Sequence, residues 1–369
     1  MKLWIFLIDC EAISMKHLNM IRDFSNANGV SGFEDEVVSV ARKYADPSFE
    51  VSEDRMRNFY IRRPENNGKR PVVQLDGHSD EVGFMVQAIK PNGTLQFITI
   101  GGWVYTNIPA HKVRVKAADG SYVPGIVTAK PPHFMSAAEA GRVPDVSEMA
   151  IDIGAVSDEE AHDDFGIRIA APVVPDVDFT YDEKHDLMMG KAFDCRLGCA
   201  AILATLDALK SENLDVDVVG AMSVQEEVGV RGARVTANTV KPDIAIVFEG
   251  CPADDTVQPG YLIQTALKKG PMLRHIDTGM ITNPRYQKYA LDLARELNIP
   301  VQESVRTGGS TNGASIHLSN EGVPVIVIGL PVRYIHSHYG IAAYKDFENA
   351  VKLATENIRR LNADVIGGF

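Results

Sequence analysis

Hydrophobic and polar residues are arranged in two different ways along this chain, and the change between them divides it into three segments. Residues 1–82 and 178–369 carry apolar runs typical of buried strands, separated by stretches with helical periodicity. Residues 83–177 carry short β-prone runs separated by Gly and Pro, with little periodicity that suits long helices. The pattern therefore predicts an α/β domain built from both ends of the chain and a β-rich insertion of residues 83–177.

The outer segments are expected to alternate between helices and strands, which is typical of an α/β sheet with helices on its faces. The expected helices are Val37–Tyr44, Leu197–Leu209, Gly232–Asn238, Tyr286–Leu297 and Phe347–Leu361. The expected strands are Pro71–Leu75, Val216–Val224, Ile244–Phe248 and Val323–Ile328. Within the insertion we expect strands at Val82–Ile89, Leu95–Ile100, Lys112–Val115, Val123–Val127 and Ile167–Ala170.

The composition is that of a globular protein that builds its own core. The 369 residues are 45% hydrophobic and 23% charged, and this length suits two domains or one large domain with an insertion. A net charge of -12 disfavours nucleic acid and anionic membranes as partners and is compatible with metal ions. No run approaches the roughly 18–20 uncharged residues that a membrane-spanning helix needs.

Cysteine use and the start of the chain indicate a cytoplasmic protein. Cys10, Cys195, Cys199 and Cys251 form no CxxC pair and no disulfide framework in a chain of this size. The apolar run 4–8 is too short for a signal peptide, and acidic residues follow it. Met15 is an alternative start, which would make the first fourteen residues an extension.

Imidazole and carboxylate side chains follow the expected strands, at the edge where open α/β sheets place their ligand sites. His78 and Asp80 come after the strand that ends near Leu75, and a carboxylate can take the proton of a metal-binding imidazole's second nitrogen. Asp194 stands just before a long helix. Taken singly, a hydrogen-bonded turn explains the first pair and a helix N-cap explains Asp194.

Further candidates follow later strands. Glu226 and Glu227 point in different directions at a strand end, so one could bind a metal while the other faces a substrate; a solvated pair is the alternative. Glu249 ends an apolar strand, where a charge is often only the exit of the strand into water. His336 and His338 share a side in an extended chain, and only one of them need be a ligand.

Considered together, these segments point to a metal centre. Imidazole and carboxylate ligands suit zinc, cobalt or manganese. Five such ligands exceed what one tetrahedral site with an open position needs. They fit two metals that share a carboxylate, roughly 3.5–4 Å apart.

The chain resembles the tetrahedral (TET) metalloaminopeptidases, the family of glutamyl aminopeptidases, deblocking aminopeptidases and proteins once called cellulase M. The resemblance runs from about Leu18 to the C-terminus. The motifs that carry it, in order, are GHSDEVGF, IGGW, IDIGAVSDEEAHDDFGIRIAAPVV, KAFDCRLGCA, VQEEVGVRGA, VFEG and GVPVIVIGLPVRYIHS. It implies an α/β fold: a mixed-sheet dimetal exopeptidase domain with an inserted small β-barrel domain that serves in dimerisation.

The resemblance also implies roles for individual residues. Two metal sites share one ligand, and their residues are His78, Asp194 and Glu249 for the first and Asp194, Glu227 and His336 for the second. Glu226 would be the general base and acid that works on a metal-activated water, and Asp80 would hydrogen-bond His78. The family commonly has Asp where Glu249 stands, and Glu reaches about one methylene further.

Substrate and partners follow from the same resemblance. The expected activity is removal of the N-terminal residue of short peptides with two divalent ions per subunit, zinc or cobalt first and manganese as the further candidate. Gly308, Gly309 and Arg333 are placed in the substrate pocket, although segment 308–313 differs from the usual Gly-Thr-Asp-Ala pattern. Self-association to dimers and a tetrahedral dodecamer is expected, and His317 and His338 receive no role.

Two other interpretations use the same residues. A glycoside hydrolase also needs paired carboxylates, but it needs no histidine ligands, and the aromatic content of 7% leaves few platforms for sugars. A noncatalytic scaffold of the same fold would be expected to have lost a ligand or the base, and none is lost here.

Overall fold

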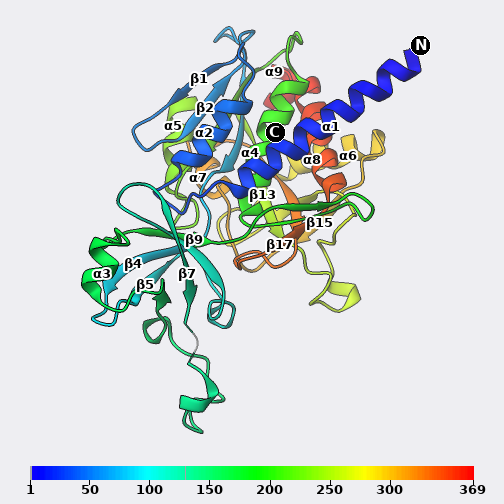
Figure 1. Ribbon diagram of the computed structural model, residues 1–369. Helices are drawn as coiled ribbons and strands as arrows, with labels where there is room; N and C mark the ends of the chain where they lie inside the picture. Colours follow the sequence, from blue (N-terminus) through cyan, green and yellow to red (C-terminus); the bar gives the residue numbers. More distant parts are fainter. Residues whose placement is uncertain (1, 129) are drawn as a thin grey trace.

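A computed structural model describes residues 2–128 and 130–369, with side chains from residue 13 onward. It contains a large mixed sheet covered by helices and, beside it, a closed barrel of antiparallel strands (Figure 1). The expected fold class, an α/β domain with a small inserted barrel, is confirmed. Residue Met1 and the side chain of Cys10 lie outside the described part.

The large sheet has eight strands, and its central strands run parallel. Strands β12, β3, β13 and β16 are parallel neighbours. Strand β2 is antiparallel to β12, and β14 is antiparallel to β16. The strands in spatial order are β1 (Glu50–Glu53), β2 (Phe59–Arg62), β12 (Asp217–Ser223), β3 (Val72–His78), β13 (Ile244–Pro252), β16 (Val325–Val332), β14 (Met272–Ile276) and β15 (Gln302–Val305).

Helices cover both faces of this sheet because its central strands are apolar on both sides. In β13, Ile244, Ile246 and Phe248 join the larger core, while Ala245 and Val247 join a second core on the other face. Helices of the larger core are α1 (Lys2–Asn26), α2 (Asp35–Tyr44), α4 (Phe193–Ala208), α6 (Pro284–Glu296) and α8 (Tyr344–Arg360). Helices α5 (Arg231–Val240) and α7 (Gly313–Ile316) cover the second core.

The insertion closes into a barrel with its own core. Phe84 packs edge-on against Phe97 and stacks on Trp103, with ring centroids 5.0 and 4.6 Å apart. The strands around the barrel are β4 (Gly83–Ile89), β5 (Leu95–Ile100), β8 (Ile151–Asp152), β7 (Tyr122–Val127), β6 (Lys112–Lys116) and β9 (Pro172–Pro175). Figure 1 shows this barrel beside the sheet rather than over one of its faces.

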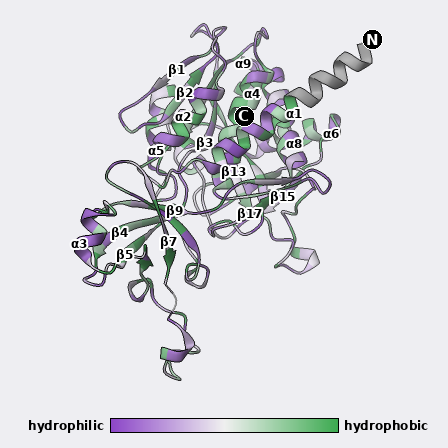
Figure 2. Ribbon diagram, in the orientation of Figure 1, coloured by the Kyte–Doolittle hydropathy of each residue, from purple (hydrophilic) through white to green (hydrophobic). Residues whose placement is uncertain are grey.

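Smaller elements complete the described fold. A three-stranded sheet consists of β10 (Thr180–Asp182), β11 (Leu187–Gly190) and β17 (Gly340–Ala342). Two short helices are α3 (Asp158–Asp163) and α9 (Ala363–Gly367). In Figure 2, α4 is mostly hydrophobic in colour and α3, on the barrel, mostly hydrophilic. Among the described helices, none combines the length and hydrophobicity that crossing a membrane requires.

One expected strand is wrong. Residues 167–170 form an irregular segment that ends in a turn, because Ala170 adopts a left-handed backbone conformation with φ of 68°. The barrel strand begins two residues later, at Pro172, and pairs with β4 and β6. The other expected helices and strands are present with small shifts of their ends.

A buried ion cluster fixes the loop after β3 to the beginning of α4: Lys191 lies just before this helix and Arg196 lies in its first turn. The Glu81 carboxylate accepts from Lys191 Nζ at 2.6 Å and from Arg196 Nη2 at 3.1 Å, and all three side chains are at most 2% exposed. Arg196 Nε also donates to the Ser79 carbonyl at 2.7 Å. Removing one partner would leave a buried charge unpaired, which is strongly destabilising. The cluster therefore sets the positions of the two segments that carry His78 and Asp194.

Candidate metal centre

The four central parallel strands end at one edge of the sheet, and the candidate ligands gather there. His78 is the last residue of β3, and Glu226 and Glu227 lie in the turn after β12. Glu249 lies inside β13, five residues after its first residue Ile244, and His336 lies in the loop after β16. Parallel strands direct their carboxyl ends to the same edge, so residues from distant parts of the chain meet.

His78 is surrounded by acidic groups. Its Nε2 lies 3.1 Å from Asp194 Oδ1 and 3.3 Å from Glu249 Oε1, and its side chain is only 1% exposed. Its Nδ1 lies 3.3 Å from Asp80 Oδ1 and 3.2 Å from the carbonyl oxygen of the same residue. One ring nitrogen therefore faces the shared carboxylates, and the other is held from behind.

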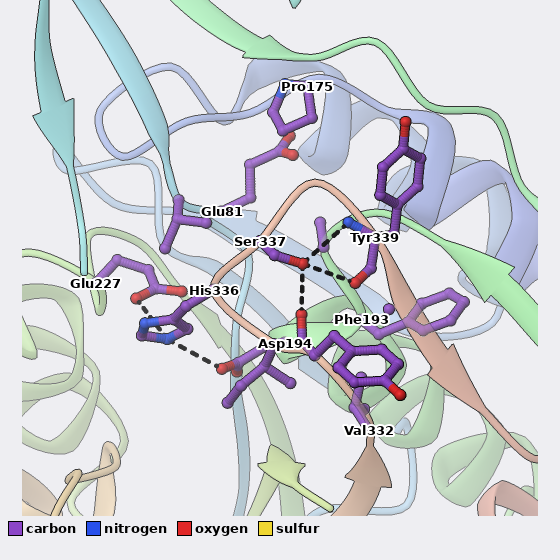
Figure 3. Close-up of a pocket in the computed structure, with 14 residues that line it drawn as sticks. Glu81, Pro175, Phe193, Asp194, Glu227, Val332, His336, Ser337 and Tyr339 are labelled. Carbon is purple, nitrogen blue, oxygen red and sulfur yellow. Dashed lines mark hydrogen bonds and ion pairs between the residues drawn. The ribbon is translucent and has the colours of Figure 1, made fainter. Parts of the chain in front are cut away.

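His336 makes a second arrangement of the same kind. Its Nε2 lies 3.5 Å from Asp194 Oδ2 and 3.4 Å from Glu227 Oε2. Figure 3 shows the imidazole between these two carboxylates. The loop bends sharply here, because Tyr334 and His336 both have positive φ angles of 63° and 56°.

Asp194 lies between the two histidines and belongs to both groups of possible ligands. Its Oδ1 faces His78 and its Oδ2 faces His336. Gly250 leaves room for it, because a Cβ at that position would lie 2.5 Å from the Asp194 Cα. The two groups of ligand atoms that lie within 4.8 Å of one another are His78, Asp194, Cys195 and Glu249, and Asp194, Glu227 and His336.

Asp80 connects the first histidine to the turn that carries the two glutamates. Its carboxylate accepts from the backbone N–H groups of Glu226 at 2.9 Å and Glu227 at 3.1 Å. Ser31 Oγ donates to the same carboxylate at 2.6 Å. Burial opposes the ionised form of Asp80, but the hydrogen bond with His78, the charge of His78 and the donors Ser31 and Glu226 outweigh it and lower the pKa.

Burial and mutual charge shift the pKa values of several groups in this cluster. Burial raises the pKa of Glu226 to about 7, against the charge of His78. Burial also raises the pKa of Glu227 and of Glu249 well above their usual values. For His336, burial opposes the charged form, but the hydrogen bond with Asp194 and the charge of Glu227 outweigh it and raise the pKa to about 9.

The donor set fits divalent metal ions. Glu249 Oε2 is buried and has no hydrogen-bond partner among the described residues, as expected of an oxygen whose partner is a cation. Carboxylate oxygens and imidazole nitrogens are the ligand types that zinc, cobalt and manganese accept. The Cys195 thiol instead donates to the Phe248 carbonyl at 3.2 Å, and burial raises its pKa well above the usual value.

A cavity of about 580 Å³ opens onto these groups. Gly308 and Gly309 line it, as do Glu226 and Gly102 of the barrel. Arg333 is not among the described lining residues; it binds Asp255 through two nitrogens, at 2.9 and 2.7 Å.

Sequence reasoning missed two arginines of the cavity wall, Arg274 and Arg306. Both are single cations on or beside the strands β14 and β15, and no motif marks them.

The two histidines without a predicted role, His317 and His338, each contact another part of the fold. His338 stacks on His111 of the barrel, with ring centroids 4.2 Å apart and planes inclined by 8°. Burial lowers the pKa of His338 to about 3, so this ring is neutral. His317 Nδ1 lies 2.8 Å from the Gly313 carbonyl oxygen one helical turn earlier. Neither belongs to the two groups of possible metal ligands.

Comparison with known proteins agrees with this arrangement. Residues 58–353 match the family described as M42 glutamyl aminopeptidase. The chain is 32% identical over 357 residues to putative aminopeptidase FrvX of Escherichia coli, covering 96% of this chain and 98% of that protein. It is 31% identical over 351 residues to lysyl aminopeptidase of Pyrococcus furiosus, covering 93% and 96% of the two chains.

The fold matches a solved structure equally well. The TET aminopeptidase of a Thaumarchaeota archaeon from marine sediment superimposes with a TM-score of 0.90 at 36% identity, covering 96% of this chain and 99% of that one. The matched family region contains every candidate ligand, from His78 to His336. This chain therefore belongs to the M42 aminopeptidase family and is a metallopeptidase that acts at the N-terminal end of peptides.

Proposed function

We propose that this protein removes the N-terminal residue of short peptides with two divalent metal ions, and that Glu226 is its general base. One observation carries the proposal: the two oxygens of Asp194 face two different imidazoles, at 3.1 and 3.5 Å. A shared carboxylate between two imidazole–carboxylate groups is the arrangement that a two-metal site requires.

The two ions would be held by the groups described above. His78 and Glu249 would complete the first site, Glu227 and His336 the second, and Asp194 would bridge them. Such ions supply Lewis acidity to the scissile carbonyl and offset the negative charge that develops during attack. Zinc or cobalt is proposed first and manganese as the further candidate, because all three accept these ligands.

Glu226 is proposed as the proton carrier because it lies beside the ligand groups without belonging to either. Its Oε2 is 3.9 Å from His78 Nε2, and its side chain lines the cavity. From there the carboxylate can take a proton from the attacking water and return it to the leaving amine. Its neighbour Glu227 turns toward His336 instead.

Asp80 is proposed as a positioning residue. It accepts the backbone N–H groups of both glutamates and faces the second nitrogen of His78. A carboxylate behind a ligating imidazole fixes the orientation and tautomer of the ring. The same carboxylate therefore orients one proposed ligand and aligns the turn that carries the proposed base.

A glycosidase finds no comparable support in the cavity. Sugar sites commonly use aromatic rings as platforms, and among the described lining residues none is Trp, Tyr or Phe. Nor does glycoside hydrolysis explain the two histidines, since paired carboxylates suffice for that chemistry.

We propose that the barrel mediates dimerisation and that dimers build a closed tetrahedral dodecamer. The barrel exposes Ile98, Val104 and Ile126 at 42%, 57% and 52% of their surface. Exposed apolar side chains on the barrel are suited to contact with the barrel of a second subunit. An assembly with closed symmetry does not extend into filaments. A closed shell would admit short peptides and exclude folded proteins.

The barrel also touches the metal centre directly, through the glycines that follow β5. A Cβ on Gly102 would lie 3.0 Å from His336 Nδ1, and one on Gly101 would lie 3.3 Å from the Glu227 Cβ. Both proposed ligands of the second site are therefore confined from the barrel side. The insertion positions the second site in addition to any role in assembly.

The proposed function predicts metal-dependent hydrolysis of aminoacyl anilides. Purified protein treated with excess chelator and dialysed should lose activity, because the charge stabilisation at the carbonyl is lost, and added zinc, cobalt or manganese should restore it. An anilide blocked at its amine serves as the substrate control and should not be cleaved. Full activity after prolonged chelation would contradict the two-metal proposal.

The two adjacent glutamates should respond differently to the same substitution. Glu226→Gln keeps the size of the side chain but cannot accept a proton, so we expect a rate at least about a hundredfold lower with both metals retained. Glu227→Gln should weaken one metal, and excess metal should partly restore its rate. The measurement is metal content by elemental analysis together with kcat for each variant.

Each variant is the matched control of the other, since both change one carboxylate to an amide in the same turn. If Glu226→Gln loses a metal while Glu227→Gln keeps both, the two roles are reversed. A Glu226→Gln rate near that of the wild type would exclude the general-base role.

Substitution Gly102→Ala tests the contact between barrel and metal centre. The new methyl group should shift His336 by a few tenths of an ångström, and we expect kcat/KM to fall about threefold to tenfold because catalysis depends steeply on position. The melting temperature should change little. Gly141→Ala is the control, because a Cβ there meets nothing within 4 Å. Equal activities in the two variants would exclude a positioning role for Gly102.

A further inference from the structure

The two histidines proposed as metal ligands are held in different ways. Asp80 lies behind His78, with its Oδ1 3.3 Å and its carbonyl oxygen 3.2 Å from Nδ1 of the ring. Behind His336 lies Gly102, where a Cβ would be 3.0 Å from Nδ1, and glycine has no side chain that could accept a hydrogen bond. Because the second nitrogen ordinarily orients a ligating imidazole, His336 needs another support.

The loop that carries His336 has a shape that its own residues do not favour. Tyr334 and His336 have φ angles of 63° and 56°, a region that residues other than glycine seldom adopt. Ser337 Oγ lies 2.7 Å from the carbonyl oxygen of Tyr334 and 2.9 Å from that of Tyr339, so it joins the two ends of the turn (Figure 3). A strained backbone of this kind persists only where the surrounding structure holds it.

His338 provides a contact between this loop and the barrel. It is 1% exposed, and its ring stacks on His111 with centroids 4.2 Å apart and planes inclined by 8°. Its ring centroid is also 5.1 Å from that of Trp103, which stacks on Phe84 at 4.6 Å. Since Phe84 belongs to the core of the barrel, a row of rings runs from that core to the loop.

The surroundings of His338 hold it by packing and not by hydrogen bonds. Neither of its ring nitrogens has a hydrogen-bond partner among the described residues, and the ring belongs to neither group of possible metal ligands. Stacking between flat rings is favourable beyond the area that it buries. Successive barrel residues, Gly102 and Trp103, therefore border His336 and His338, so a shift of the barrel would move both histidines.

We propose that His338 is a positioning residue of the second metal site: its stack on the rings of the barrel anchors the loop and holds His336 in place. Nε2 of His336 lies 3.5 Å from Asp194 Oδ2 and 3.4 Å from Glu227 Oε2, so a tilt of the loop would move the imidazole relative to both carboxylates. The inference rests on the proposed two-metal function and adds a support for it that comes from the inserted barrel.

Zinc binding by the complete chain tests this role, because the position of a ligand affects affinity. Titration calorimetry and elemental analysis are applied to the wild type, His338→Ala and His111→Ala. The wild type should bind two ions. Each Ala variant removes the stack and should raise the dissociation constant of one ion by about tenfold, the lower end of the effect of losing an outer contact of a ligand. The other ion should bind as before.

A conservative variant separates the stack from the imidazole itself. His111→Phe keeps a flat ring against His338, so it should bind both ions with the affinities of the wild type. His111 is half-buried, so its variants keep the test open if His338→Ala does not fold. Weakened binding in His111→Phe equal to that in His111→Ala would overturn the role of ring stacking.

A second background identifies which ion responds. His336→Ala removes a proposed ligand of the second site and leaves the first site alone. In this background the remaining ion should bind equally well with His or Ala at position 338. Weaker binding of that ion with Ala at position 338 would overturn the proposal, because His338 would then act on the first site.

Leu95→Val is the matched control for a general weakening of the barrel. Leu95 is fully buried in the barrel core and begins β5, whereas Gly102 follows the other end of that strand. The variant should lower the melting temperature without changing the affinity for either ion. If it weakens one ion as much as His111→Ala does, barrel stability is the cause and the proposal is wrong.

The inference and the proposed function fail separately. Fewer than two ions in the wild type would reject the two-metal function. Two ions in the wild type, with unchanged affinities in both Ala variants, would reject only the role of His338. Weakened binding in His338→Ala without any change in His111→Ala would also overturn that role, since the loop would not depend on the barrel.

Discussion

The arrangement of this protein depends on holding several buried carboxylates together at one edge of a sheet. Asp194, Glu227 and Glu249 are each at most 12% exposed at the side chain, and all three lie around two imidazoles. Like charges in a dry site repel one another, so such a cluster persists only with protons or cations among them. The raised pKa values of both glutamates express this conflict, and divalent cations would resolve it.

Much of the surrounding structure serves to keep these groups in place. Asp80 accepts three hydrogen bonds, from Ser31 and from the backbone of Glu226 and Glu227. The Glu81–Lys191–Arg196 cluster fixes the loop after β3 to the beginning of α4. Glycine at position 250 lets Asp194 approach β13. These contacts hold the candidate ligands in place through protein groups alone, as a preorganised centre requires.

Local patterns were sufficient to predict most of the core elements but not where they end. The strand expected at Pro71–Leu75 was expected to end there, yet β3 continues to His78. Asp76 can remain inside the sheet because Gln74 and Asn312 donate to it, at 2.8 and 2.6 Å, and Asn312 comes from a distant segment. Long-range partners of this kind leave no mark in the local sequence.

Dependence on long-range contacts also explains which site residues could be predicted from the sequence and which could not. His78, Glu227 and Glu249 stand next to apolar runs, so their neighbourhood at one sheet edge could be predicted from topology. Arg274 and Arg306 come from the edge strands β14 and β15, and their place in the cavity depends on the pairing of these strands with β16. The segment 167–170 was misassigned because its apolar residues resemble a strand, although Ala170 turns the chain.

Metal stoichiometry measures whether Asp194 is shared between two metal ions, as we propose. Zinc binding is measured by titration calorimetry and elemental analysis on the wild type and on Asp194→Asn, with Asp292→Asn on the exposed surface as the control. We expect two ions per chain in the wild type and in the control, and weakened binding of both ions in Asp194→Asn. Asp194→Asn that binds both ions with unchanged affinity, or loses only one while the other is unaffected, would contradict the bridging role.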